Sequence, residues 1–318
     1  MSQSYQIPQT QQAARIHSYG EREVLTLESA PIPTINADDV LVKIHATSIN
    51  PVDWKVRKGY LQNFLPHKLP LTLGWDLAGE IVALGDEVTG WKMGDAVYSR
   101  PDIARDGTYA EYIAVRASEI AHKPQTLNWQ EAAGVPLVAL TAWQVLYEFA
   151  KLQAGERVLI HAGSGGVGTF AIQLAKLRGA YVYTTSSTRN VALLKSLGAD
   201  EVIDYTQQDF STLRDLDVVF DTLGGDVQQK SWQTLKRGGR LVSIVSVPDA
   251  ATAEQHGVTP LFCFVQPSAP QLNELAKLID AGKIQIIIDS VYALKDIVQA
   301  QEKSEGGRAI GKIVVQVA

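Results

Sequence analysis

The feature that most constrains the fold is a glycine-rich turn between a predicted strand and a predicted helix. The apolar run Arg157–His161 leads into Gly163–Gly168, which has the spacing GxGxxG, and an amphipathic helix is expected over Val167–Arg178. Glycines at this spacing allow a tight turn and let a pyrophosphate approach the helix N-terminus. A structural turn without a ligand is the alternative, but the strand and helix around the turn favour a dinucleotide. The predicted cofactor-binding residues here are Gly163, Ser164, Gly165, Gly166 and Val167.

Strands and helices alternate on both sides of this turn. Further strands are expected over Tyr181–Thr185, Glu201–Ile203, Asp217–Asp221 and Arg240–Val245, with helices over Asn190–Leu197 and Asp226–Leu235. Such alternation predicts a doubly wound parallel sheet covered by helices on both faces.

The first third of the chain has a different character. Short β-type runs separated by Pro and Gly predict a barrel-like all-β unit. After an expected helix over Gln271–Ala281, the tail returns to β character in Ile284–Val291 and Lys312–Val317 and is expected to rejoin the first unit. We therefore predict one domain from residues 1–126 and 283–318 and another from residues 127–282.

Composition limits the class of protein. A chain of 318 residues with 46% hydrophobic and 20% charged residues is typical of a globular protein with room for two cores. The net charge of -5 argues against nucleic-acid and anionic-membrane partners, and no apolar run is long enough to span a bilayer. Cys263 is the single cysteine, which excludes a zinc site built from several cysteines. We expect a cytoplasmic protein.

The end of the second predicted strand indicates which nicotinamide cofactor binds. An NAD site usually has an acidic residue about 20 residues after the glycine motif. Residues 169–199 contain none, and the strand ends in Ser186, Ser187 and, two residues later, Arg189. Hydroxyls and a guanidinium suit a 2′-phosphate, so we predict NADPH. The alternative for Arg189 is a position at a helix start without a ligand.

Several motifs resemble one family over about residues 14–317. Ser48–Lys55, Gly74–Val82, Gly94–Tyr98 and His161–Gly168 are similar to motifs of the zinc-free medium-chain dehydrogenase/reductase superfamily, in its quinone oxidoreductase and enone oxidoreductase branch. The resemblance implies an α/β fold: a Rossmann domain plus a discontinuous GroES-like β-barrel domain. It also implies a homodimer.

The same resemblance bears on metal chemistry. Asn50 stands where zinc-dependent relatives have a cysteine ligand, and Trp75–Asp76 replaces their His-Glu pair. These residues cannot supply the three ligands of a catalytic zinc ion. Without that Lewis acid, an already electrophilic acceptor is the expected substrate, which points to a quinone or an α,β-unsaturated carbonyl compound (an enone).

The resemblance also implies roles for single residues. Asn50 and Lys55 are expected to face the nicotinamide, with Lys55 donating a hydrogen bond to the substrate carbonyl; an exposed lysine without this role is the alternative. Thr141 and Lys312 match cofactor-contacting positions, although Thr141 is equally compatible with helix capping. Tyr205 resembles a residue beside the 2′-phosphate, or is a plain surface aromatic. Positions after strand ends, where sheet ligands bind, are Leu223, Gly224 and Ser246.

Other functions stay open at this stage. One is a non-catalytic NADPH-binding protein of the zeta-crystallin type, and another is an enoyl-thioester reductase, although no basic cluster suits coenzyme A. The stretch 247–260, rich in Ala and Thr, is typical of a mobile loop that could act as a lid.

Overall fold

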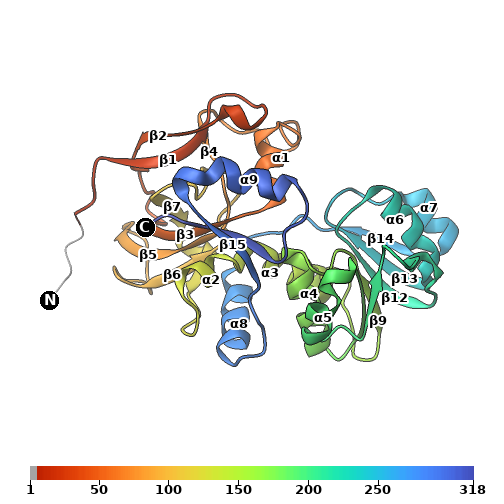
Figure 1. The fold of residues 1–318 in the computed structure, drawn as a ribbon. Coiled ribbons are helices and arrows are strands. Elements are labelled where there is room, and N and C mark those ends of the chain that lie inside the picture. Colours follow the sequence, from red (N-terminus) through yellow and green to blue (C-terminus); the bar gives the residue numbers. More distant parts are fainter. Residues whose placement is uncertain (1–5) are drawn as a thin grey trace. The chain divides into compact units, whose positions relative to one another are not determined.

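The computed structural model describes residues 6–318, which form two compact units (Figure 1). The first unit contains the described residues up to Leu137 together with Gln266–Gly282 and Ile288–Ala318. The second contains Val138–Val265 and Lys283–Ile287. Among the described residues, no helix combines the length and hydropathy needed to cross a membrane.

The first unit is built on two sheets. The smaller sheet has the order β2-β1-β4, from Leu25–Pro31, Thr10–Ile16 and Leu71–Thr72. The larger sheet has the order β15-β16-β3-β5-β6-β8, with β7 also paired to β3. Its strands are β3 (Asp39–Ile49), β5 (Leu77–Leu84), β6 (Ala96–Ser99), β7 (Tyr112–Arg116), β8 (Ile120–His122), β15 (Ile288–Ala293) and β16 (Lys312–Gln316). Val42, Ile44, Leu77, Ile81 and Val97 belong to its buried core.

Helices from both ends of the chain complete this unit. They are α1 (Pro51–Arg57), α2 (Trp129–Ala133), α8 (Ala269–Asp280) and α9 (Ile297–Glu305). In Figure 1 the blue α8 and α9 lie among red, orange and yellow elements, so segments far apart in the sequence share one unit. The hydroxyl of buried Tyr98 donates to the carbonyl of Leu272 at 2.6 Å, which ties β6 to α8.

The second unit is a six-stranded parallel sheet in the order β11-β10-β9-β12-β13-β14. Figure 1 shows α4 and α5 on one face and α6 and α7 on the other. The strands are β9 (Arg157–Ile160), β10 (Tyr181–Ser186), β11 (Glu201–Asp204), β12 (Leu216–Asp221), β13 (Leu235–Ser243) and β14 (Thr259–Phe262). The helices are α4 (Gly166–Leu177), α5 (Val191–Ser196), α6 (Gly225–Ser231) and α7 (Ala250–His256). This is the 3-2-1-4-5-6 order of a Rossmann sheet.

A continuous helical stretch lies at the boundary of the units. Helix α3 covers Pro136–Trp143, and a π-helical segment continues it over Gln144–Phe149. Short 3-10 turns occur elsewhere, at Arg22–Val24, Ala117–Glu119, Thr188–Asn190, Phe210–Thr212, Trp232–Thr234 and Leu294–Asp296.

The predicted fold class is confirmed, and two local expectations differ from the structure. The stretch 247–260 is not an open loop, because α7 forms within it and the Asp249 carboxylate accepts from the backbone N–H of Thr252 at 2.7 Å. Such an N-cap satisfies a donor that the first helical turn would otherwise leave free. The boundaries of the units also differ from the expected ones, since Gln266–Gly282 belongs to the first unit, where α8 contacts Tyr98.

Candidate active site

The glycine-rich turn links β9 to α4 with little space for side chains. A Cβ on Gly163 would lie 2.0 Å from Oγ1 of Thr184, and one on Gly168 would lie 2.5 Å from the carbonyl oxygen of Ala162. Glycine at these two positions therefore lets α4 start directly against the strand. Gly165 caps the helix, and the first backbone N–H groups of α4 have no partner within the helix. This turn has the form needed to hold a pyrophosphate.

Three serine hydroxyls gather beside this turn around the amide of Asn190. Its Nδ2 donates to Ser164 Oγ at 3.0 Å, Ser186 Oγ at 3.2 Å and Ser187 Oγ at 3.4 Å. Asn190 is 4% exposed, so its amide is fixed in place. The two hydrogens of this amide are shared among three acceptors, and the Ser186 hydroxyl donates to Ser164 Oγ at 3.3 Å, so the O–H groups of Ser164 and Ser187 are the ones available as donors to an anion. Ser164, Ser186 and Ser187, predicted separately, are thus brought together.

The adjoining turn after β11 supports this serine cluster. The backbone N–H of Tyr205 donates to the carbonyl of Ser186 at 3.1 Å, and the Tyr205 side chain is 61% exposed. The Asp204 carboxylate accepts from the hydroxyls of Thr188 and Thr206. These hydrogen bonds lower the pKa of Asp204. Arg189, on the 3-10 turn Thr188–Asn190 after β10, is exposed at the surface of this unit.

The remaining predicted cofactor residues of this unit follow two neighbouring strands. The backbone N–H groups of Leu223 and Gly224 donate to Asp221 Oδ1 at the end of β12, at 3.0 and 2.8 Å. Ser246 is exposed just beyond β13. Parallel strands present their carboxyl ends at one edge, so these positions share an edge with the glycine turn. Thr141 lies inside α3 and is 3% exposed, which excludes the helix-capping alternative for it.

His161 has a structural environment. Its ring lies between Oγ1 of Thr185 (3.2 Å from Nδ1) and Oγ of Ser231 (2.9 Å from Nε2), and Phe210 packs edge-on against it. Burial lowers the pKa of His161 to about 4. A neutral, fully hydrogen-bonded imidazole at this position braces β9 rather than exchanging protons near neutral pH.

In the first unit, the end of β3 and the start of β16 form a buried polar cluster. The Lys312 ammonium donates to Asn50 Oδ1 at 2.6 Å, to the carbonyl of Ile49 at 3.0 Å and to Asp76 Oδ2 at 3.3 Å. The Asn50 amide donates in turn to Asp76 Oδ2 at 2.7 Å. Lys312 is 3% exposed, and Asn50 and Asp76 are fully buried. We call Asn50, Asp76 and Lys312 the buried triad.

The contacts of the buried triad bear on two predicted roles. Three acceptors use the three hydrogens of the Lys312 ammonium, so its partners are within its own unit, and the predicted cofactor contact stays a prediction. The oxygen and the nitrogen of the Asn50 amide are both hydrogen-bonded within this unit, and its predicted position facing the nicotinamide stays a prediction. Asp76 accepts two further bonds, from Ser48 Oγ at 2.5 Å and from the backbone N–H of Leu137 at 2.7 Å.

Helix α1 begins at the triad and carries Lys55. Asp53 in its first turn accepts from the backbone N–H of Asn50 at 2.7 Å, and Pro51 opens the helix. The Lys55 ammonium lies 5.7 Å from the centre of the Trp54 ring, and burial lowers its pKa. A half-buried ammonium on a short, capped helix can present a charged hydrogen-bond donor to a substrate oxygen.

Asp53 is the most strongly perturbed carboxyl group in this region. Burial raises its pKa to about 7, although hydrogen bonds from the Tyr109 hydroxyl, at 2.5 Å, and from Asn50 act in the opposite direction. Both hydrogen bonds go to Oδ2, and Oδ1 is buried with no partner among the described residues. A carboxyl group in this state holds a proton near neutral pH.

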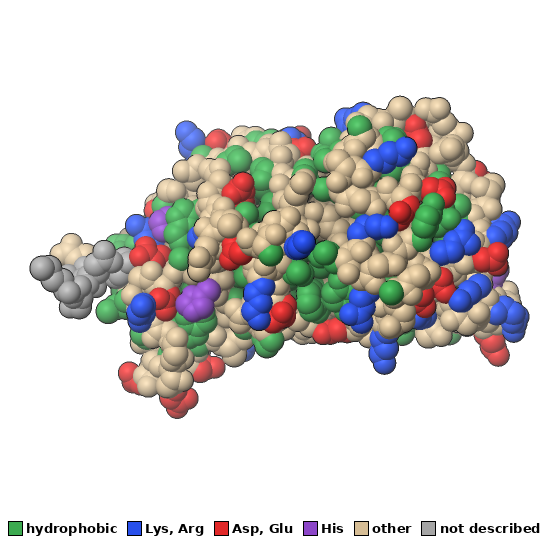
Figure 2. Space-filling model, turned by 90° about the horizontal axis from the view of Figure 1, so that it is seen from below, with side chains coloured by type: hydrophobic (Ala, Val, Ile, Leu, Met, Phe, Trp, Pro, Cys, Tyr) green, Lys and Arg blue, Asp and Glu red, His purple; other side chains and the backbone are tan. Residues whose placement is uncertain are grey.

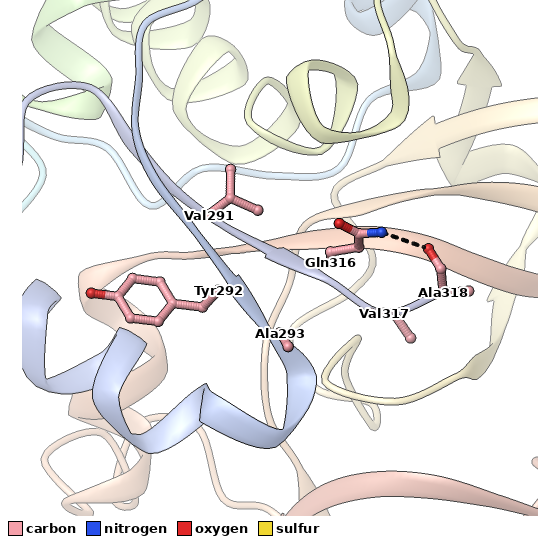
Figure 3. A pocket seen from close by; sticks show the side chains of 6 residues that line it. All are labelled: Val291, Tyr292, Ala293, Gln316, Val317 and Ala318. Atoms are coloured by element: carbon pink, nitrogen blue, oxygen red, sulfur yellow. Dashed lines mark hydrogen bonds between the residues drawn. The ribbon is translucent and has the colours of Figure 1, made fainter.

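A pocket of about 320 Å³ lies away from all these residues. It is lined by Val291, Tyr292 and Ala293 of β15 and by Gln316, Val317 and Ala318 (Figure 3). The Gln316 amide donates to the carbonyl of Ala318 at 3.3 Å. None of the predicted site residues lines it, so we do not place the active site there.

The sequence reasoning missed several polar residues near the predicted ones. Asp53 had a signal, because Asn-x-x-Asp before a helix is a capping pattern. The contact of Asn190 with Ser164 carried no local signal, because the two residues are 26 positions apart in the sequence.

Comparisons with known proteins agree with this architecture. A family model described as "Alcohol dehydrogenase GroES-like domain" matches residues 36–125, and one described as "Zinc-binding dehydrogenase" matches residues 197–315. A 2-methylene-furan-3-one reductase of Solanum lycopersicum is 40% identical over 329 residues, covering 99% of this chain and 81% of the relative. NAD(P)H oxidoreductase RTN4IP1, mitochondrial, of Danio rerio is 33% identical over 348 residues, covering 95% and 90%.

A solved structure has the same fold as this chain. The quinone oxidoreductase from Coxiella burnetii superposes with a TM-score of 0.90 at 36% identity, covering 97% of this chain and 100% of that one. The two units and the two family models define a medium-chain dehydrogenase/reductase. Within that superfamily, the chain belongs to the quinone and enone oxidoreductase branch, and the predicted resemblance is confirmed.

The buried triad gives a first prediction. Lys312→Met removes the cation and leaves the Asp76 carboxylate buried without its charge partner. We expect the free energy of unfolding, measured by urea denaturation, to fall by about 3–5 kcal/mol. The double variant Lys312→Met, Asp76→Asn removes both charges and should recover part of that loss. A single variant as stable as the wild type would show that the contact contributes nothing.

The raised pKa of Asp53 gives a second prediction. An unfolded aspartate has a pKa of about 3.9, so between about pH 4 and pH 7 the folded protein holds a proton that the unfolded chain has lost. This contribution to stability is complete below pH 4 and disappears as the pH rises through 7, with a slope of at most about 1.4 kcal/mol per pH unit.

Asp53→Asn should remove this contribution while keeping both hydrogen bonds, because one amide oxygen can accept from Tyr109 and Asn50. The measurement is the free energy of unfolding of the wild type and the variant at pH 5, 6, 7 and 8. We expect the wild type to lose stability relative to the variant over this range. Asp86→Asn, at an exposed position, is the control. Parallel curves for wild type and Asp53→Asn would contradict the prediction.

Proposed function

We propose that the protein is an NADPH-dependent, zinc-independent oxidoreductase that reduces the carbon–carbon double bond of enones, or quinones. The observation that carries the proposal is the buried triad, in which an ammonium is bonded to the side chains of both Asn50 and Asp76. The names of the similar proteins, an enone reductase, an NAD(P)H oxidoreductase and a quinone oxidoreductase, support the same reaction class.

The donor set of the triad does not fit a zinc ion. A catalytic zinc needs three protein ligands, usually cysteine, histidine or carboxylate. Here one carboxylate and one amide contact an ammonium instead, and a zinc ion beside them would be repelled by Lys312. The proposed reaction therefore uses acceptors that are electrophilic without metal activation.

The residues of the second unit fit a dinucleotide. The start of α4 would hold the pyrophosphate, and the serines around Asn190 would bind the 2′-phosphate together with Arg189. When bound, the nicotinamide supplies a hydride. In this proposal Lys55 donates a hydrogen bond to the substrate carbonyl oxygen, where negative charge develops as the double bond is reduced.

The function is tested by NADPH consumption with short enones, quinones and saturated alcohols, before and after treatment with a chelator. We expect turnover of enones or quinones that chelation does not reduce. Lys55→Met should lower kcat/KM by about 10- to 100-fold, because a charged donor to the developing oxyanion is lost. Lys92→Met, whose lysine is exposed in the same unit, is the matched control.

Two outcomes would overturn this proposal. Loss of activity on chelation, or turnover of alcohols alone, would mean that the triad does not replace a metal. Lys55→Met activity within a few-fold of the wild type would remove Lys55 from the mechanism.

Cofactor preference gives a separate prediction. Arg189→Ala should raise the dissociation constant of NADPH by about 10-fold and leave that of NADH within about two-fold, because only the 2′-phosphate contact is lost. Fluorescence titration of both cofactors measures this. Arg237→Ala, at an exposed position of the same unit, is the control. Equal effects on the two cofactors would argue against NADPH selectivity through Arg189.

The localisation, the oligomeric state and the partners of the protein are also part of the proposal. The chain is proposed to be a cytoplasmic homodimer without a nucleic-acid or membrane partner. On the face seen in Figure 2, Lys and Arg side chains are interspersed with Asp and Glu, which does not favour a polyanion. The second candidate is a non-catalytic NADPH-binding protein, which cofactor binding without turnover of any acceptor would indicate.

A further inference from the structure

Arg100 is a buried arginine that makes no hydrogen bond to any other described residue. It directly follows β6 and is 2% exposed. Within residues 6–318 its guanidinium has no hydrogen-bond acceptor and no carboxylate oxygen within 4.0 Å, and its Nε is buried without a partner. Burial lowers its pKa to about 10, so it is still charged at neutral pH. An unpaired buried charge is costly and calls for an explanation.

The carboxyl groups that act electrostatically on Arg100 are already engaged with other donors. Four of them raise its pKa through longer-range attraction: Asp102, Asp76, Glu119 and Asp53. Asp102 and Glu119 both pair with Arg116, at 3.0 and 2.7 Å. Asp76 is bonded to Lys312, and Asp53 accepts from Tyr109. The guanidinium thus lies in a negative environment but lacks a direct partner.

The position of Arg100 relates it to the candidate active site. Ser99 pairs with Leu77 across β6 and β5, so Arg100 lies next to the start of β5, where Asp76 precedes Leu77. Ile49, before Asn50, pairs with Ile313, after Lys312. The ends of β3 and β6 and the starts of β5 and β16 therefore meet at one end of the sheet, and Arg100 belongs to the same end as the buried triad.

We propose that Arg100 binds a carboxylate group of the substrate, and hence that the preferred substrates are enones that carry a carboxylate. The planar guanidinium offers two terminal nitrogens in a fork that matches two carboxylate oxygens. A singly charged group neutralises the guanidinium, whereas a phosphate dianion would add excess charge near the carboxylates of Asp102, Asp76 and Glu119. This inference rests on the proposed enone reduction and specifies its substrate class.

The test compares 4-oxo-2-pentenoate with its methyl ester, two enones that differ in charge, using the full-length protein and NADPH. For the wild type we expect kcat/KM to favour the acid by about 10- to 100-fold, mainly through KM. Arg100→Met should abolish this preference, and Arg100→Lys should keep only part of it because the fork is lost. Arg22→Met, at a partly exposed arginine of the same unit that pairs with Glu302, should retain it.

A binding measurement separates this inference from the proposed reaction. Levulinate, the saturated analogue, cannot be reduced at a double bond, and its methyl ester is the neutral control. Levulinate should raise the Tm of the wild type more than the ester does, and this difference should vanish in Arg100→Met. This difference in Tm can be observed even if the protein reduces no enone. A lack of enone turnover would overturn only the proposed function.

Stability distinguishes a binding role from a structural one. Without ligand, Arg100→Met should unfold at a temperature equal to or above that of the wild type, because it removes an unpaired buried charge. Equal kcat/KM for acid and ester in the wild type would overturn the proposal. A preference for the acid that persists in Arg100→Met, or a Tm many degrees below the wild type, would overturn it as well.

Discussion

The contact on which the first unit depends most is the one between Lys312 and the Asn50–Asp76 pair. A lysine at the start of β16 reaches two groups that belong to the N-terminal third of the chain. Because all three side chains are buried, each needs the others to offset its loss of hydration. The same contact fixes the side-chain amide of Asn50, and Asn50 is the N-cap residue of α1. The orientation of Lys55 therefore follows from a residue more than two hundred positions away in the chain.

Much of the architecture could be predicted because local patterns carried it. The glycine turn with its flanking strand and helix is a short-range signal, and β9 and α4 begin and end within a residue or two of the expected positions. The alternation of strands and helices predicted the parallel sheet, because it is also a short-range pattern in the sequence. The serines of the cofactor site also lay in a short segment after a strand, where ligands of parallel sheets bind.

The features that could not be predicted from the sequence depend mostly on contacts between distant segments. The expected domain boundary placed α8 with the second unit, because only the tertiary contact of Leu272 with Tyr98 shows its place in the first. The helix over residues 250–256 is an exception, because its first turn is rich in alanine, a strong helix former, and its cap Asp249 is the preceding residue. The isolation of Arg100 could not be predicted, since it follows from the pairing of every nearby carboxylate with another group.

The pairing of β16 with β3 has a consequence for synthesis on the ribosome. The chain is made from its N-terminus, so residues 39–49 emerge long before residues 312–316. Until then the edge of β3 that β16 later covers has open backbone groups, and the Asp76 carboxylate lacks its cation. The second unit is almost continuous in sequence and can complete its sheet earlier. A nascent chain therefore passes through a stage with a formed nucleotide fold and an unfinished candidate active site, which exposes it to chaperones and proteases.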